Sequence, residues 1–188
     1  RRMNFLATIP FVDLLGMELV ACEAGQAEIA LTLREELTNS WSVAHGGVTM
    51  TLLDVVMAHA ARSPSEPGAD PHPGVVTIEM KTSFLQPGVG RLVAHGNLLH
   101  RTASMAFCQA SVRDADGRLV GHGTGTFKYM NGLPVRSEGR RIQRLNASDE
   151  PRARTWCELA VAAIPRSRRR QPLRRAGAAL RRAIELGG

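Results

Sequence analysis

The sequence lacks any apolar run of 18 or more residues, which excludes a membrane-spanning helix of ordinary length. The apolar segment from Phe5 to Val20 is interrupted by Pro10, Asp13 and Glu18, and this argues against the core of a signal peptide. The chain has 3 cysteines in 188 residues, too few for a disulfide framework. We therefore expect no integral membrane association and a reducing, cytoplasmic setting.

Motifs for metal, phosphate and serine chemistry are also missing. The 6 histidines are scattered, and no cysteine pair has the spacing of a metal site. No glycine-rich phosphate loop and no serine-centred nucleophile elbow occurs. We expect neither a metal nor a cofactor.

Basic residues are abundant, with a net charge of +7, but they are unevenly distributed. Residues 1–130 hold 10 Lys and Arg against 12 Asp and Glu, whereas residues 131–188 hold 14 Arg against 5 acids. This division predicts one domain over 1–130 and an Arg-rich extension over 131–188 that is partly helical or disordered. Because Trp156 is the only aromatic residue of the extension, binding of nucleic acid there is the less favoured alternative.

Apolar periodicity predicts an α+β domain in residues 1–130. One long helix is expected at His45–Arg62, after a short helix at Thr8–Leu15. Six strands are expected at Met17–Cys22, Gln26–Leu33, Val75–Leu85, Arg91–His100, Met105–Arg113 and Arg118–Tyr129. In the last strand, three alternate glycines predict close packing of another backbone or helix.

The motif His45-Gly46-Gly47 opens the long helix. The first amides of a helix have no intrahelical acceptor and lie at the positive end of its dipole, so they suit an oxygen that gains negative charge. Asp54 follows about two turns later among apolar residues, where a carboxylate is costly without a purpose. The alternatives are a loop that simply precedes a core helix and an aspartate on a solvated face.

Helical spacing predicts which residues share a face with Asp54. That set is Gly47, Met50, Thr51, Met57, Ala58 and Ala61. The face is small and mixed in character, unlike a purely apolar core stripe.

Further motifs accompany these residues in a fixed order. They are Asn39, Gly74–Met80, Phe84–Gly88, Asp114–Val120 and Gly123–Phe127. With this set the chain resembles the hotdog-fold acyl-CoA thioesterases, in the PaaI-like branch of phenylacetyl-CoA and 4-hydroxybenzoyl-CoA thioesterases. The resemblance covers about residues 11–129.

The resemblance implies a hotdog fold, in which a curved antiparallel sheet wraps around one long central helix. It also implies hydrolysis of an acyl-CoA thioester to free acid and CoA. Two subunits would join edge to edge into a homodimer, commonly doubled to a homotetramer, with the active site at the interface.

Catalytic roles follow from the same resemblance. The Gly46 amide would polarise the thioester carbonyl, and Asp54 would be the nucleophile or the general base. Asn39 and His45 would position the thioester or the water, and Thr77 would orient the attacking water. Because Gly46 and Asp54 are about 12 Å apart along one helix, we expect them to serve one thioester from different subunits.

Substrate contacts are expected from residues around these groups. Gly47 is expected to contact the substrate. Lining of a medium-chain or aromatic acyl pocket is expected from Met50, Met57, Trp41 and Phe84, and contact with the CoA phosphates from His100 and Arg101. The turn at Arg101 departs from the glycine-containing basic turn of many relatives. A non-catalytic acyl-CoA or fatty-acyl binding module and a hotdog dehydratase are the alternatives, and the histidine–acid spacing of the dehydratases is not found.

Overall fold

The computed structural model describes residues 3–5, 7–66, 69–130, 133–134 and 141–142. Its elements are α1 (Pro10–Leu15), β1 (Glu18–Glu23), β2 (Gln26–Thr32), the 3₁₀ helix η1 (Glu35–Leu37), α2 (Gly46–Arg62), β3 (Gly74–Phe84), β4 (Arg91–Arg101), β5 (Met105–Arg113), β6 (Leu119–Met130), β7 (Leu133–Pro134) and β8 (Arg141–Ile142). The chain divides into two compact units, Arg1–Ala147 and Ser148–Gly188, and every described residue belongs to the first.

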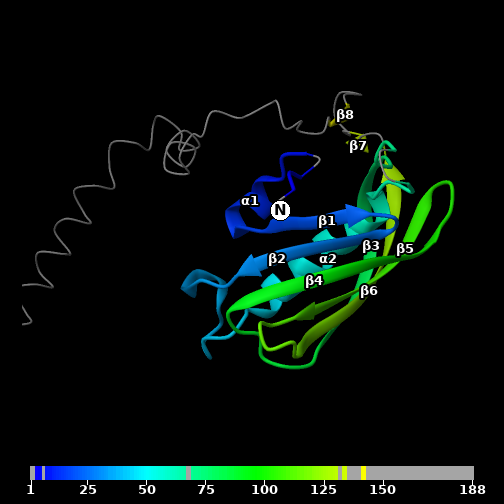
Figure 1. The fold of residues 1–188 in the computed structure, drawn as a ribbon. Helices are drawn as coiled ribbons and strands as arrows, with labels where there is room; N and C mark the ends of the chain where they lie inside the picture. Colours follow the sequence, from blue (N-terminus) through cyan, green and yellow to red (C-terminus); the bar gives the residue numbers. More distant parts are fainter. Residues whose placement is uncertain (1–2, 6, 67–68, 131–132, 135–140, 143–188) are drawn as a thin grey trace, which may run out of the picture. The chain divides into compact units, whose positions relative to one another are not determined.

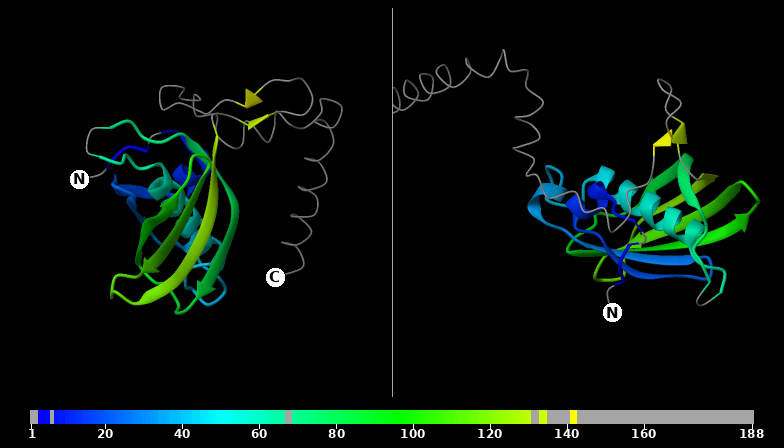
Figure 2. Two further views of the ribbon diagram at one scale, coloured as in Figure 1. Left: turned by 90° about the vertical axis from the view of Figure 1, so that its right-hand side faces the viewer. Right: turned by 90° about the horizontal axis from the view of Figure 1, so that it is seen from above.

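Six strands form one antiparallel sheet in the order β1-β2-β4-β5-β6-β3. The sheet curves around α2, which lies against its concave face (Figures 1 and 2). The chain runs from β2 through α2 to β3 at the opposite edge, so β3 pairs only with β6 among the described strands. This arrangement is the hotdog fold, and it confirms the predicted fold class.

Glycines let α2 pack directly on the sheet. A Cβ added at Gly96 of β4 would lie 2.7 Å from the Val56 carbonyl oxygen, closer than real Cβ contacts come. A Cβ at Gly121 or Gly123 of β6 would meet the side chains of Thr49 and Leu53. The structure thus confirms the predicted close packing at the alternate glycines of β6. The element that packs against them is the helix α2.

The core lies between α2 and the sheet. Large apolar side chains from both layers are fully buried there. They are Leu52, Leu53, Val56 and Met57 of the helix and Ile29, Leu31, Leu92, Val112 and Phe127 of the strands. Burying each large apolar side chain contributes about 1.5–3 kcal/mol to the stability of the fold. These contacts together hold the helix at a fixed position and rotation on the sheet.

The predicted strands agree with the observed ones to within one or two residues, but the first helix begins at Pro10 rather than Thr8.

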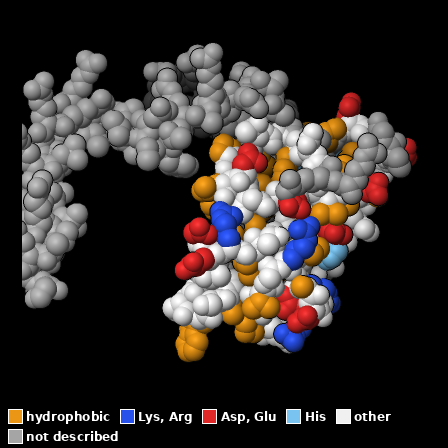
Figure 3. All heavy atoms as spheres, turned by 60° about the vertical axis from the view of Figure 1, so that its left-hand side comes forward, with side chains coloured by type: hydrophobic (Ala, Val, Ile, Leu, Met, Phe, Trp, Pro, Cys, Tyr) orange, Lys and Arg blue, Asp and Glu red, His pale blue; other side chains and the backbone are white. Residues whose placement is uncertain are grey.

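No helix among the described residues is long and apolar enough to cross a membrane. On the face drawn in Figure 3, acidic and basic side chains are interspersed. The helices predicted within 131–188 lie outside the described residues, and the boundary at residue 130 stays a prediction.

We predict that Gly96→Ala destabilises the protein, because the added methyl group would push the α2 backbone away from β4. Overpacking of this kind costs about 1–3 kcal/mol in the free energy of unfolding, measured by chemical denaturation. His95→Ala is the matched control, because this neighbouring side chain points away from α2 and is 47% exposed. Equal stability of the two variants would contradict the close contact.

Candidate active site

The start of α2 presents one amide that has no acceptor among the described residues. The ring Nδ1 of His45, the N-cap, accepts the Gly47 amide at 3.0 Å. The His45 carbonyl oxygen accepts the amides of Val48 and Thr49 at 2.9 and 3.2 Å. Only the Gly46 amide remains, at the positive end of the helix dipole. This amide is available to an oxygen from outside the helix.

An aromatic ring lies beside that amide. The Phe84 ring, at the end of β3, lies 3.5 Å from the point where a Cβ at Gly46 would be. Phe84 itself is 56% exposed, so its ring presents an apolar surface next to the Gly46 amide. The structure therefore brings Gly46, His45 and Phe84 together at one end of α2.

Asp54 lies in the middle of α2 and is half-buried. Its Oδ1 accepts a hydrogen bond of 2.7 Å from the Thr77 hydroxyl on β3. Burial raises the pKa of Asp54 above its ordinary value of 3.8, and the Thr77 hydrogen bond partly opposes this. A carboxylate with a raised pKa is a better proton acceptor than a solvated one, and it is held here in one orientation.

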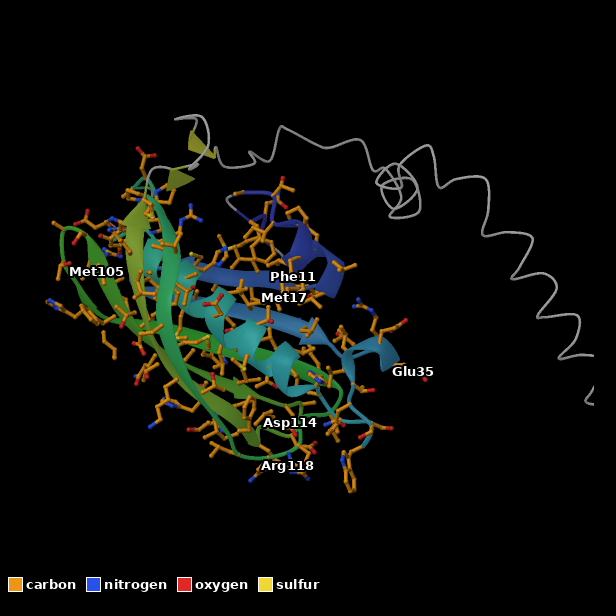
Figure 4. The ribbon with its side chains drawn as sticks, turned by 180° about the vertical axis from the view of Figure 1, so that it is seen from behind. Phe11, Met17, Glu35, Met105, Asp114 and Arg118 are labelled. Carbon is orange, nitrogen blue, oxygen red and sulfur yellow. The ribbon has the colours of Figure 1, made fainter. Side chains whose placement is uncertain are left out.

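One face of α2 is not covered by the sheet (Figure 4). Met50 is exposed on this face, and Thr51, Asp54 and Ala58 are half-buried. The prediction that Met57 lies on this face is wrong, because its side chain is 0% exposed and packs toward Gly125 of β6. Ala61, seven residues after Asp54, is in line with it along the helix but is also 0% exposed. The structure therefore does not bring Met57 to this surface.

Asn39 precedes the helix in a closed loop. Its side-chain oxygen accepts the Trp41 amide at 2.9 Å, and its backbone amide donates to the Val43 carbonyl. These bonds fold residues 39–43 into a compact loop that leaves Trp41 83% exposed. The side-chain oxygen of Asn39 thus shapes the loop, and the predicted contact with thioester or water stays a prediction.

The guanidinium of Arg101 is hydrogen-bonded to other groups of the protein. Its guanidinium donates to the Tyr129 hydroxyl, the Ser65 hydroxyl and the Ala61 carbonyl at 2.9, 3.2 and 3.0 Å, and it lies 2.6 Å from His72 Nε2. The carbonyl belongs to the last turn of α2, so Arg101 ties the helix end to β4 and β6. His100 instead is exposed and stacks on Phe107. This arrangement favours a structural role for Arg101 over the predicted phosphate contact.

The sequence reasoning missed a cavity whose walls include Ala58 of α2 and Val75 of β3. It has a volume of about 220 Å³ and lies between α2, the start of β3 and residues 7–9. Its walls come from three segments far apart in sequence, so no local pattern predicts it. Among the described residues no group of three or more His, Cys, Asp or Glu is placed to hold a metal ion.

Comparisons with known proteins agree with this fold and these motifs. The model of the thioesterase superfamily matches residues 42–121. Human acyl-coenzyme A thioesterase 13 is 30% identical over 120 residues, which are 62% of this chain and 82% of that protein. The medium/long-chain acyl-CoA thioesterase YigI of Escherichia coli K12 is 26% identical over 135 residues, 65% of this chain and 87% of YigI.

A solved structure is also similar. A variant of the phenylacetic acid degradation protein PaaI from Thermus thermophilus superposes with a TM-score of 0.56 at 25% identity, covering 65% of this chain and all of that one. The fold and the sequence together define a hotdog protein with an amide and a carboxylate on its central helix. The chain belongs to the thioesterase superfamily.

We predict that Thr77→Val raises the pKa of Asp54 further. The hydrogen bond from Thr77 stabilises the ionised carboxylate, so its loss leaves the effect of burial unopposed. The measurement is a ¹³C NMR titration of the Asp54 carboxyl group. Thr126→Val is the control, because Thr126 donates a similar bond of 2.8 Å to the exposed Glu79. A pKa of Asp54 that is the same in both variants would refute this effect of Thr77.

Proposed function

We propose that the protein hydrolyses acyl-CoA thioesters to free acid and CoA, with the Gly46 amide as oxyanion donor and Asp54 as the reacting carboxylate. One observation carries this proposal: α2, in a thioesterase-superfamily fold, bears two functional groups. These are the Gly46 amide, which has no acceptor among the described residues, and the half-buried Asp54 carboxylate, which is held by Thr77. The names of two relatives, human acyl-coenzyme A thioesterase 13 and the acyl-CoA thioesterase YigI, support acyl-CoA as the substrate.

The chemistry needs few groups, because a CoA thiolate is a good leaving group. The Gly46 amide stabilises the negative charge on the thioester oxygen as the carbonyl carbon is attacked. Asp54 either takes a proton from the attacking water or attacks the carbon itself and is then released by water. In both routes the C–S bond breaks and the thiolate leaves. Thr77 holds the carboxylate in place.

The two groups act from different subunits. Asp54 comes eight positions after Gly46 on the helix, which corresponds to a rise of about 12 Å. This distance is too long for both groups to reach one thioester from the same subunit. The free edge of β3 supplies the means of pairing, because unpaired strand edges associate readily. Its apolar side chains Ile78 and Phe84, with the adjacent Leu85, are 54%, 56% and 52% exposed. We propose an edge-to-edge homodimer through β3, and the homotetramer remains a prediction.

We predict that Asp54→Asn lowers kcat about 10²–10⁴-fold on acyl-CoA substrates, because the amide can neither accept the proton nor attack. The assay is thiol release from a panel of short, long and aromatic acyl-CoAs. Unchanged circular dichroism and oligomeric state would assign the loss to chemistry. If the variant turns over as fast as the wild type, or if the wild type hydrolyses none of the panel, a non-catalytic binding module becomes the better description.

The shared site predicts complementation between two inactive variants. Gly46→Pro removes the amide proton and adds the proline ring. The helix should tolerate it, because proline is accepted at the first position of a helix and His45 already has the extended backbone that proline favours before it. Mixed dimers of Gly46→Pro and Asp54→Asn would contain one intact site. With random pairing, co-expression should restore about a quarter of the wild-type activity.

The control is Gly46→Ala, which keeps the amide and adds a Cβ at an ordinary contact distance from Phe84. It should retain activity and should not need complementation. If the mixed dimers are as inactive as the two parents, both groups act from one chain and the interface proposal is wrong.

A further inference from the structure

The walls of the cavity begin one helical turn from Asp54 and two strand residues from Thr77, although neither of these side chains lines it. Ala58, in its wall, follows Asp54 by one turn of α2 and so lies on the same face of the helix. Val75, in the opposite wall, precedes Thr77 by two residues on β3 and so lies on the same face of that strand. The register of β3 with β6 is regular from Val75 to Thr77, so no bulge turns these side chains apart.

The far side of the cavity is closed by the N-terminal segment. Residues 7–9 lie across it, with Ala7 buried and Ile9 half-buried. This segment is held at its start by the Met3 amide, which donates to the Leu19 carbonyl at 3.0 Å, and at its end by α1. The edge of the Phe5 ring also packs on His59 in the cavity wall, with ring centroids 5.2 Å apart. A group that enters from the carboxylate side therefore meets a wall.

The lining favours an apolar occupant of limited size. Aliphatic surface comes from Ala7, Ile9, Ala58 and Val75. The rest of the wall is Thr8, Gly74 and the buried His59 and Arg62. Pockets for drug-sized ligands usually measure about 300–1,000 Å³, and this cavity, at about 220 Å³, is smaller. A long acyl chain does not fit such a volume, whereas a short chain or a single aromatic ring does.

We propose that this cavity receives the acyl group of the substrate, that Ala58 and Ile9 set the largest group accepted, and that the preferred substrates carry a compact acyl group. The proposal rests on the thioesterase function proposed above. It assigns this chain a narrower acyl class than the medium/long-chain activity in the name of YigI.

The test is the dependence of kcat/KM on acyl size. The substrates are straight-chain acyl-CoAs from acetyl to palmitoyl, with phenylacetyl-CoA, and the enzymes are the wild-type full chain, Ala58→Leu and Ile9→Ala. In the wild type, each methylene that fits should raise kcat/KM about fourfold until the cavity is filled. Ala58→Leu fills space and should lower kcat/KM for the largest accepted group at least about tenfold, while the shortest substrate is spared. Ile9→Ala removes side-chain volume and should move the optimum to longer chains.

Ala115→Leu is the matched control, because Ala115 is exposed in the turn between β5 and β6, away from the residues that line the cavity. It should leave the whole profile unchanged. If Ala58→Leu does not fold, as judged by circular dichroism, the opposite shift in Ile9→Ala decides the question.

The outcomes separate the two proposals. Hydrolysis with an acyl profile that neither cavity variant moves would overturn the assignment of the cavity and leave the thioesterase function standing. A wild-type preference for palmitoyl-CoA would overturn the compact class in the same way. No hydrolysis of any substrate by the wild type would overturn the thioesterase function itself, and the acyl assignment with it.

Discussion

The contact between the α2 backbone and the glycines of the sheet is the constraint on which the rest of the structure depends. Gly96 lets the Val56 carbonyl approach β4 more closely than any side chain would permit, and Gly121 and Gly123 make room for Thr49 and Leu53. Because the helix is pressed onto the sheet on one side, its other side is left open. The amide of the first turn, the carboxylate of the middle turns and one wall of the cavity all lie along that single rigid element. Their spacing is therefore set by helix geometry and not by loops.

Placing Asp54 on that face has a cost in stability. When folding raises the pKa of a group, that group favours the folded state at a pH below its pKa in the unfolded chain. This favourable contribution to the free energy of unfolding is lost as the pH rises through the pKa in the folded protein. Burial raises the pKa of Asp54, so above about pH 4 the ionised side chain increasingly opposes folding. The Thr77 hydrogen bond offsets part of this penalty. A carboxylate that only solvated a helix face would have no reason to be half-buried, and this favours a chemical role over the solvated-face alternative.

Much of the fold was predictable because its signals are local. Alternating strands and the glycines of β6 are read from neighbouring residues, and the structure confirms them. Asp54 was singled out by its apolar neighbours. The rotation of the helix was less predictable: Met57 is three residues from Asp54, near the border of its face, and the curved sheet covers that border.

What the sequence could not show depends on contacts between distant segments. Only the fold shows that the Arg101 guanidinium donates to Tyr129, Ser65 and the end of α2, and its predicted phosphate contact stays a prediction. The cavity is invisible in the sequence for the same reason, since Ile9 and Val75 meet only after β1 and β3 are placed.

The open face of α2 also supports the proposal that the site is shared between two subunits. The oxyanion donor must lie within about 3 Å of the thioester oxygen, and the carboxylate must reach the carbon or its water at a similar distance. Two groups about 12 Å apart on a rigid helix cannot satisfy both conditions. Under a two-fold axis at the β3 edge, two such helices run antiparallel, so the start of one can lie opposite the middle of the other. In that proposed arrangement, the exposed apolar edge of β3 and the uncovered face of α2 meet one requirement, because the proposed chemistry needs a second copy of the chain.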